Sequence, residues 1–263
     1  MDSCGIESPA LEASLLAAYA LNVERTWVLS HPEATIDNGN LNLLLSRRCM
    51  REPLAYILGQ KEFYGRTFAV RPGVLIPRPD SETLITAALE LIATGAKVWD
   101  LCCGSGCLGI TIKLERPTTH VSLSDLSPIA IEVSQSNAKN LGAEVEVELA
   151  DGLVALGNQR FDLIVSNPPY VEIGAELQPE VGEFEPPEAL FAGEDGLDFY
   201  KKIAAEFEGR LAPDGWLLLE LGAGQSDAVS SLFSGFTQHE WRDLSGQIRV
   251  LGVRNRHVSS LLA

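Results

Sequence analysis

A chain of 263 residues can form one large domain or two smaller ones, each with its own buried core. Hydrophobic residues make up 46% of the chain and no run of about 18 apolar residues occurs, which excludes a transmembrane helix. The net charge of −16 disfavours DNA or RNA as the main ligand, because proteins that bind phosphate backbones cluster Lys and Arg.

The N-terminus and the cysteines predict a cytoplasmic protein, which we expect to be monomeric. Acidic residues precede the first apolar stretch, where a secretory signal would carry Lys or Arg. The five cysteines are odd in number and partly crowded into residues 102–107, unlike a secreted disulfide framework. Those crowded cysteines lack metal-ligand spacing and a nearby histidine, so we expect apolar filler beside a tight turn and no metal.

Residues 171–199 contain nine acidic residues and no Lys or Arg. Such a run is typical of a solvated surface. It is equally compatible with a docking face that steers a basic partner. Both interpretations count against free nucleic acid as the ligand.

Residues 1–60 show helical patterns and no strand pattern, which predicts a small helical bundle. The first helix is expected to begin at Pro9 and the second to end at His31. The third is expected to begin after a capping Asp37, and a fourth to span residues 51–58. Apolar residues at helical spacing are expected to form the core, namely Leu11, Leu15, Leu16 and Tyr19 in the first helix and Leu41, Leu44 and Leu45 in the third.

Residues 61–80 predict a hairpin around Gly65-Arg66 and a stiff proline-rich linker. From residue 81 to 263, helices alternate with short apolar strands, which indicates βαβ units and a mainly parallel sheet of the α/β class. The expected helices span residues 81–94, 107 onward, 128–141 and 197–211, and the expected strands span residues 97–101, 121–125, 145–149, 161–165, 216–221, 239–241 and 248–253.

A glycine-rich turn follows the first strand of this sheet, and Asp125 ends the next strand 19 residues after Gly106. Ligands of open α/β sheets bind at such strand ends, and a carboxylate there can accept hydrogen bonds from ribose hydroxyls. Residues 104–109 also match the dinucleotide pattern GxGxxG, so a nicotinamide dinucleotide, S-adenosylmethionine and a purely structural turn remain open. Asp100 favours S-adenosylmethionine, because an acid near the turn suits an ammonium and would repel a pyrophosphate.

The tetrapeptide at residues 167–170, Asn-Pro-Pro-Tyr, ends the strand at 161–165. Its prolines remove backbone donors, so carbonyl acceptors remain, and the Asn167 side chain adds another acceptor. Acceptors of this kind can hold both N–H bonds of a planar NH2 group and aim its nitrogen at a methyl donor. A proline-rich turn with a capping Asn is the structural alternative.

The tetrapeptide after an apolar strand resembles methyltransferases that act on the amino group of adenine or on glutamine. Other segments resemble the release factor N(5)-glutamine methyltransferases, and the resemblance covers nearly the whole chain. The segments are residues 51–59, 62–65, 74–82, 185–193, 195–197 and 217–222.

The resemblance implies a Rossmann-like, seven-stranded, mostly parallel methyltransferase sheet with its last strand antiparallel. It implies S-adenosylmethionine as cofactor, and an N-terminal helical domain that engages a release factor. The substrate would be the glutamine of that factor's Gly-Gly-Gln loop. By matching positions, Cys102, Cys103, Gly104, Ser105 and Gly106 should surround the methionine part of the cofactor, Asp125 its ribose, Asp151 and Gly152 its adenine, and Asn167, Pro168, Pro169 and Tyr170 the glutamine amide.

The chain departs from the family pattern at three places. Cys102-Cys103 stands where Gly-Thr is usual, Gly152 where an aromatic residue is frequent, and residues 246–249 lack one of two charged residues. Adenine stacking at Gly152 is therefore in doubt.

Two rival substrates follow from the same chemistry. An adenine methyltransferase needs a basic groove, which the composition denies. A sister enzyme that modifies glutamine in a ribosomal protein would share most motifs, because a site alone does not specify its partner. A non-catalytic binding module is disfavoured by the intact tetrapeptide at 167–170.

Overall fold

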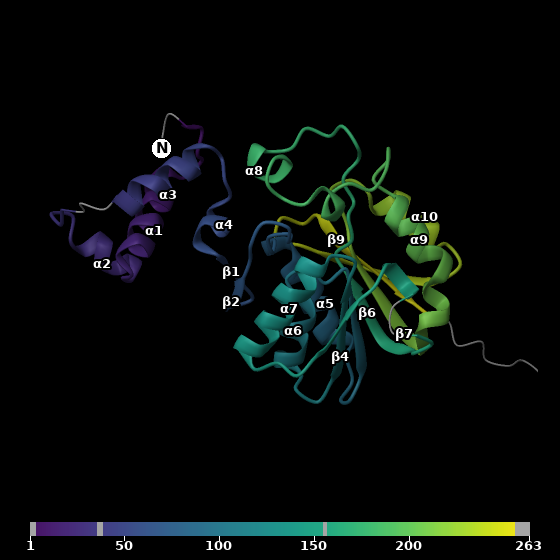
Figure 1. Ribbon diagram of the computed structural model, residues 1–263. Helices are drawn as coiled ribbons and strands as arrows, with labels where there is room; N and C mark the ends of the chain where they lie inside the picture. Colours follow the sequence, from purple (N-terminus) through teal and green to yellow (C-terminus); the bar gives the residue numbers. More distant parts are fainter. Residues whose placement is uncertain (1–3, 36–38, 155–156, 256–263) are drawn as a thin grey trace, which may run out of the picture.

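The computed structural model describes residues 4–35, 39–154 and 157–255. The chain forms a group of helices at its N-terminus and a larger α/β unit built on one sheet (Figure 1). Within the described ranges, no helix is both long and apolar enough to cross a membrane.

The N-terminal helices are α1 (Pro9–Leu21), α2 (Arg25–Ser30), α3 (Gly39–Cys49) and α4 (Leu54–Leu58). Their shared core contains Leu16, Leu44 and Ile57. The predicted apolar stripe of α1 is wrong in part, because Leu11 and Tyr19 are 44% and 49% exposed. The neighbouring helices cover only one side of α1, so the bundle is too small to bury the whole stripe.

The helix boundaries agree with the sequence prediction except at α4. The first helix begins at Pro9, and α2 ends just before His31, as predicted. The predicted cap at Asp37 lies outside the described residues. The fourth helix begins at Leu54, later than predicted, because Pro53 disfavours helical geometry in the residue before it.

A disulfide joins Cys4 to Cys49, which the cysteine count did not predict. The two cysteines are 45 residues apart in sequence, and the fold brings their Cα atoms to 5.2 Å. The other three cysteines are free, and two of them are buried, as expected for apolar filler. In the part of the chain that the structure describes, no group of three or more His, Cys, Asp or Glu side chains could hold a metal ion.

A hairpin of β1 (Gln60–Phe63) and β2 (Arg66–Ala69) links the N-terminal helices to the sheet. Its turn is Tyr64-Gly65, one residue earlier than predicted. Both turn residues have positive φ angles, 49° and 69°, as the tight turns of hairpins require.

The main sheet has seven strands in the order β5-β4-β3-β6-β7-β9-β8, which confirms the predicted fold class. Only β9 runs antiparallel to its neighbours, again as predicted. The strands are β3 (Lys97–Leu101), β4 (His120–Asp125), β5 (Glu146–Leu149), β6 (Phe161–Ser166), β7 (Leu211–Glu220), β8 (Thr237–Arg242) and β9 (Ile248–Arg254).

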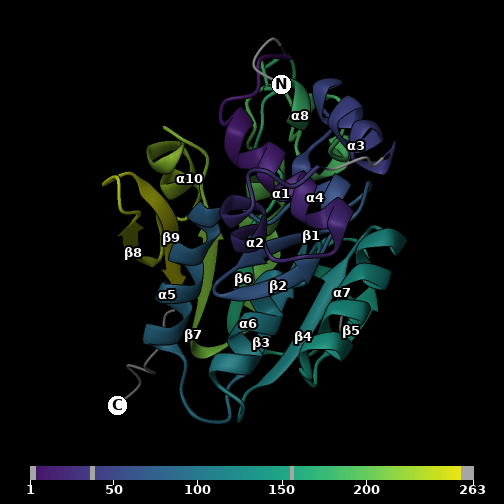
Figure 2. The same ribbon diagram turned by 90° about the vertical axis from the view of Figure 1, so that its left-hand side faces the viewer.

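Helices cover both faces of the sheet (Figures 1 and 2). On one face lie α5 (Glu82–Leu91), α6 (Cys107–Glu115) and α7 (Pro128–Leu141), which pack on Val98 and its neighbours. On the other lie α9 (Asp198–Glu206) and α10 (Ser226–Leu232), which pack on Trp99. Successive strand residues point to opposite faces, so β3 serves both cores and positions the turn that follows it.

Some elements differ from the sequence prediction. The helix after residue 81 ends at Leu91, before residue 94, and α9 gives way to the 3-10 turn η5 (Phe207–Arg210). The strand β7 therefore begins at Leu211, earlier than predicted. The prediction missed α10, the short α8 (Pro179–Gly182) and three other 3-10 turns, η2 (Pro79–Ser81), η3 (Gly152–Val154) and η4 (Pro187–Ala189).

Candidate active site

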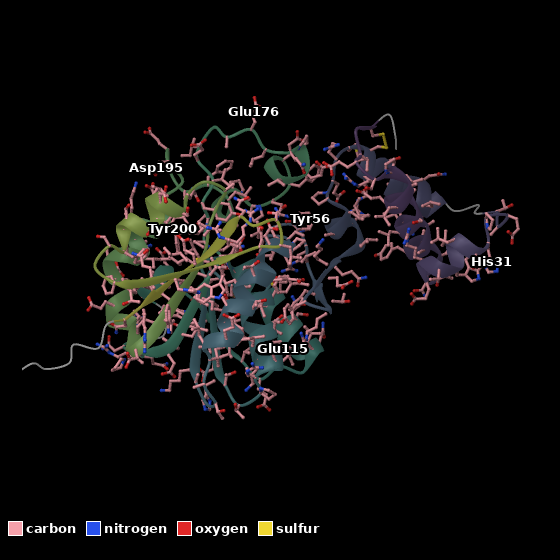
Figure 3. All side chains as sticks on the ribbon, turned by 180° about the vertical axis from the view of Figure 1, so that it is seen from behind. His31, Tyr56, Glu115, Glu176, Asp195 and Tyr200 are labelled. Carbon is pink, nitrogen blue, oxygen red and sulfur yellow. A yellow bond between two sulfur atoms is a disulfide. The ribbon has the colours of Figure 1, made fainter. Side chains whose placement is uncertain are left out.

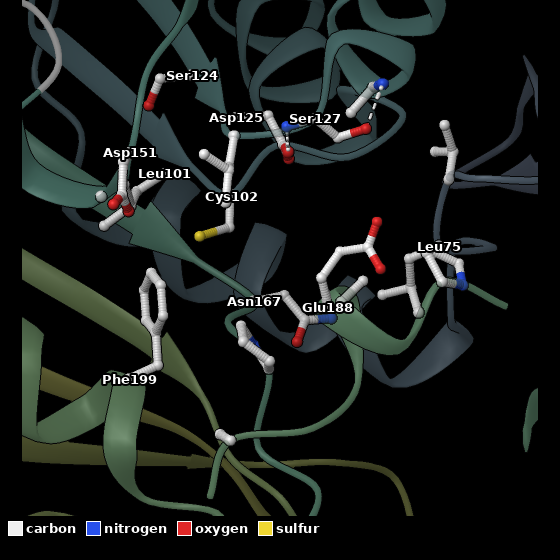
Figure 4. Close-up of a pocket in the computed structure, with 18 of the residues that line it drawn as sticks. Leu75, Leu101, Cys102, Ser124, Asp125, Ser127, Asp151, Asn167, Glu188 and Phe199 are labelled. Carbon is white, nitrogen blue, oxygen red and sulfur yellow. Dashed lines mark hydrogen bonds between the residues drawn. The ribbon is translucent and has the colours of Figure 1, made fainter.

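A cavity of about 950 Å³ opens at the carboxyl ends of β3, β4, β5 and β6 (Figure 4). This is the edge at which open α/β sheets bind ligands. The loop before α5 and the segment 186–193 complete its walls. Its lining includes Leu75, Leu101, Cys102, Asp125, Leu126, Ser127, Ile129, Asp151, Gly152, Asn167, Pro169, Glu188, Phe191, Phe199 and Lys202.

The turn after β3 requires glycine where its backbone packs tightly against neighbouring side chains. Gly106 has a φ of 78°, and a Cβ there would lie 2.8 Å from Ile110 and 3.0 Å from Leu123. The helix α6 can therefore begin close to β4 only with glycine at this position. At Gly104 a Cβ would meet no atom within 4 Å, so this part of the turn presents its backbone to open space.

Asp100 lies behind the turn, where it stabilises the helix rather than the pocket. It is fully buried, and its Oδ2 accepts a hydrogen bond from the backbone N–H of Gly109 at 2.8 Å. Burial raises the pKa of Asp100 to about 7. Asp100 is not among the residues that line the cavity, so the predicted role of this acid beside a ligand ammonium is not supported.

Asp125 connects two backbone segments at the mouth of the pocket. Its Oδ2 accepts from the N–H of Gly104 at 2.8 Å, and its Oδ1 accepts from the N–H of Ser127 at 2.9 Å. Burial raises the pKa of Asp125 in spite of these bonds, which favour the carboxylate. Each oxygen keeps a further lone pair, so the carboxylate can still accept a hydrogen bond from a ligand.

Asp151 forms an ion pair with Lys202, whose Nζ lies 2.9 Å from Oδ1. A Cβ on Gly152 would lie 3.2 Å from the same Nζ, so Lys202 occupies the space beside this glycine. The ring of Phe199 faces the pocket near Asp151 and Leu101 (Figure 4). An aromatic surface therefore exists here, although it comes from α9 and not from position 152.

The tetrapeptide at 167–170 ends β6 at the floor of the cavity. Asn167 and Pro169 line the cavity, and Asn167 faces the same space as Cys102 (Figure 4). Tyr170 packs partly against the core, where burial raises its pKa to about 12. Its carbonyl accepts a hydrogen bond from Gln225 at 2.9 Å, which holds the end of the tetrapeptide in place.

The predicted site residues therefore fall into two groups. Cys102, Asp125, Asp151, Gly152, Asn167 and Pro169 line the cavity, while Cys103, Gly104, Ser105, Gly106, Pro168 and Tyr170 are not among its lining residues. Sequence reasoning missed Leu126, Glu188, Phe191, Phe199 and Lys202 as lining residues. Two signals could have drawn attention to Glu188, namely the acidic run at 171–199 and the segment 185–193 that carries the family resemblance.

Two acids of that run, Glu180 and Glu185, are not exposed and form ion pairs with arginines, while the exposed Asp195 and Asp198 pair with Lys201. Glu185 is buried, accepts from the N–H of Ile76 at 3.0 Å and pairs with Arg78 at 2.5 Å. Glu180 pairs with Arg48 at 2.9 Å and Arg51 at 2.5 Å, which joins α8 to the N-terminal helices. The other seven acids are exposed, namely Glu172, Glu176, Glu183, Glu188, Glu194, Asp195 and Asp198.

Comparison with known proteins identifies the family. Residues 1–59 match the family model "PrmC N-terminal domain", and residues 78–183 match "Methyltransferase small domain". A release factor glutamine methyltransferase from Koribacter versatilis is 40% identical over 260 residues, covering 95% of this chain and 93% of the relative. One from Geobacter sulfurreducens is 42% identical over 258 residues, covering 95% and 91%.

The chain belongs to the release factor glutamine methyltransferase family. Solved structures agree on the fold of this family member. A methyltransferase from Pyrococcus furiosus superposes with a TM-score of 0.57 at 15% identity, covering 75% of this chain and 92% of that one. A 16S rRNA methyltransferase from Thermus thermophilus, in complex with AdoMet and guanosine, has a TM-score of 0.52 at 22% identity, covering 75% and 50%.

S-adenosylmethionine is the cofactor of this methyltransferase, and the pocket residues fit it. The carboxylate of Asp125 is an acceptor that suits ribose hydroxyls. Leu126 and Ile129, 61% and 39% exposed, offer apolar surface of the kind that a flat base covers. The open backbone at Gly104 allows close approach of a ligand to the turn.

Proposed function

We propose that this methyltransferase transfers a methyl group to the side-chain amide nitrogen of a glutamine, in the Gly-Gly-Gln loop of a peptide chain release factor. The observation that carries the proposal is the position of Asn167 and Pro169. Both residues line the cavity, and Asn167 faces the same space as Cys102 of the turn at 102–106 (Figure 4). Relatives that carry the release factor name match the chain over nearly its whole length.

Bound S-adenosylmethionine supplies an electrophilic methyl group. The turn at 102–106 surrounds the methionine part, Asp125 accepts from the ribose, and Asp151 and Gly152 border the adenine. Phe199 and Leu126 provide the apolar surface for the base that Gly152 itself lacks. These roles depend on close approach of the cofactor to the glycine backbone and on the hydrogen-bond acceptors that the cavity presents.

The tetrapeptide holds the substrate nitrogen. The side-chain oxygen of Asn167 and a proline carbonyl accept the two N–H bonds of the glutamine amide and orient its nitrogen. Orientation of reacting groups contributes several kcal/mol out of the roughly 7–11 kcal/mol available from proximity. The same carbonyl dipoles stabilise the positive charge that develops on nitrogen during transfer.

The partner is a protein with a basic surface near its substrate loop. Seven exposed acids lie on the segment that borders the cavity, and the side chains of Glu176 and Asp195 project outward (Figure 3). Such a field attracts a basic protein and repels nucleic acid. We place the activity in the cytoplasm, where translation takes place, and the enzyme in a monomeric state.

The test is a methyl-transfer assay with labelled S-adenosylmethionine, purified release factor and a Gln→Ala variant of its Gly-Gly-Gln loop. Peptide mass mapping then locates the label. Label on the loop glutamine, absent from the variant, is the expected result. Label on a ribosomal protein or on nucleic acid instead would overturn the proposed substrate while leaving the transfer chemistry intact.

A further inference from the structure

Behind Asn167, on the side away from the cavity, lies a buried pair of polar residues that no step described so far uses. The Nδ2 of Asn167 donates to the hydroxyl oxygen of Ser81 at 3.2 Å. The Ser81 hydroxyl lies close enough to the carboxyl group of Glu220 to lower the pKa of that group, and the Oε2 atom of Glu220 is buried with no other hydrogen-bond partner. Both Ser81 and Glu220 are 2% exposed, and neither lines the cavity.

The order of donors along this chain determines which way the Asn167 amide faces. An ionised Glu220 has no proton and can only accept, so its unpartnered carboxylate oxygen favours a Ser81 proton that points toward it. The Ser81 oxygen then offers lone pairs to Asn167, which must present its NH2 group. A flipped amide would place its oxygen against those lone pairs and leave a buried polar atom without a partner.

We infer that Ser81 and Glu220 are positioning residues, which hold the amide of Asn167 with its NH2 group inward and its oxygen toward the cavity. The inference rests on the proposed role of Asn167 as an acceptor for the glutamine amide. With the amide reversed, NH2 would face NH2 and the substrate nitrogen would lose its acceptor. Three different parts of the chain meet here, namely the start of α5, the end of β6 and the end of β7.

The surroundings of Glu220 favour a proton-dependent arrangement. The pKa of Glu220 is raised to about 7, chiefly by burial and also by Asp80, while Ser81, Arg249 and Arg78 act to lower it. Tyr170 and Tyr200 also lie near this carboxyl group, and the Tyr200 hydroxyl donates to the backbone carbonyl of Glu220. A protonated Glu220 can donate to Ser81, which frees the Ser81 proton to face Asn167 and reverse the amide.

The kinetic test compares Ser81→Ala with the conservative Ser81→Thr, which keeps a hydroxyl. With the release factor as substrate and saturating S-adenosylmethionine, Ser81→Ala is expected to lower kcat by roughly tenfold or more, while Ser81→Thr retains most of it. Cofactor affinity, measured by calorimetry, should stay the same in both variants. The kcat of the wild type is expected to rise with pH near 7, and Glu220→Gln is expected to lose this rise.

A second measurement does not depend on turnover. In the ¹⁵N-labelled protein, the Asn167 side-chain amide resonance, assigned by its loss in Asn167→Ala, should shift in Ser81→Ala. Wild-type kcat in Ser81→Ala, an equal fall in kcat in Ser81→Ala and Ser81→Thr, or an unmoved resonance would overturn the inference. A wild-type enzyme that leaves the release factor unlabelled would refute the proposed function instead, and the resonance would still test the positioning.

Discussion

Replacing Asp125 by Asn should destabilise the turn at residues 102–106 as well as remove a contact to the cofactor. The carboxylate accepts from two backbone N–H groups, those of Gly104 and Ser127, at 2.8 and 2.9 Å. An Asn side chain offers one oxygen and one NH2 group, so one of these N–H groups would face another donor. Stability should fall by about 1–3 kcal/mol, the cost of an orphaned buried donor, even without cofactor.

The assay pairs chemical denaturation of the cofactor-free protein with calorimetric titration of S-adenosylmethionine. Cofactor affinity should fall by roughly tenfold or more, because the turn and the ribose acceptor are both perturbed. Asp162→Asn is the matched control. Its carboxylate is exposed and accepts one backbone N–H, from Lys97 at 2.8 Å, which a single Asn oxygen can replace. If Asp125→Asn weakened cofactor binding but left the free energy of unfolding unchanged, the role of Asp125 in stabilising the turn would be refuted. Unchanged cofactor affinity would refute its role as ribose acceptor.

Three further substitutions test residues that stabilise the structure around the site. Gly196→Ala should lower the thermal midpoint of unfolding, because φ is +69° and a Cβ would lie 2.3 Å from the Tyr170 carbonyl, whereas Gly209→Ala, in open space, should not. Glu185→Ala should lower the free energy of unfolding by about 1–3 kcal/mol in chemical denaturation, because it leaves the buried N–H of Ile76 without its acceptor and removes the partner of Arg78, and an unchanged free energy would contradict this. Asp100→Asn should change how stability depends on pH.

The sign of the Asp100 effect follows from its raised pKa of about 7 against an ordinary value of 3.8. Between these values the folded protein holds a proton that the unfolded chain has released, so stability contributed by this group falls as pH rises and is constant above about 7. The wild type should therefore lose stability relative to Asp100→Asn from pH 4 to 7. A difference in unfolding free energy that does not vary with pH would contradict the burial of this carboxyl group.

Local patterns were sufficient for most of the fold. The strand at 97–101 and the helix from Pro128 to Leu141 were predicted because apolar runs, capping residues and prolines act over a few neighbouring positions. The antiparallel last strand was implied by the family resemblance and not by such local patterns. The short α8 and α10 were missed, since helices of that length depend on tertiary packing for their stability.

The sequence by itself determined that the candidate site residues lie at the ends of strands. A turn of glycines after one strand, an acid after the next and the tetrapeptide at 167–170 all belong to strand ends, which a parallel sheet brings to one edge. Residue types and their order along the chain are enough for that conclusion, because the topology of such sheets leaves few alternatives.

Only the tertiary structure decided which residues contact the candidate site residues and hold them in place. The bond of Ser81 to Asn167 spans 86 residues, the pair of Lys202 with Asp151 spans 51, and the disulfide of Cys4 spans 45. No local periodicity records such contacts, since each depends on how separate elements pack. The same holds for the burial of Asp100, which turned a predicted ligand contact into a support for α6, because hydrogen bonding to Gly109 places it behind the turn.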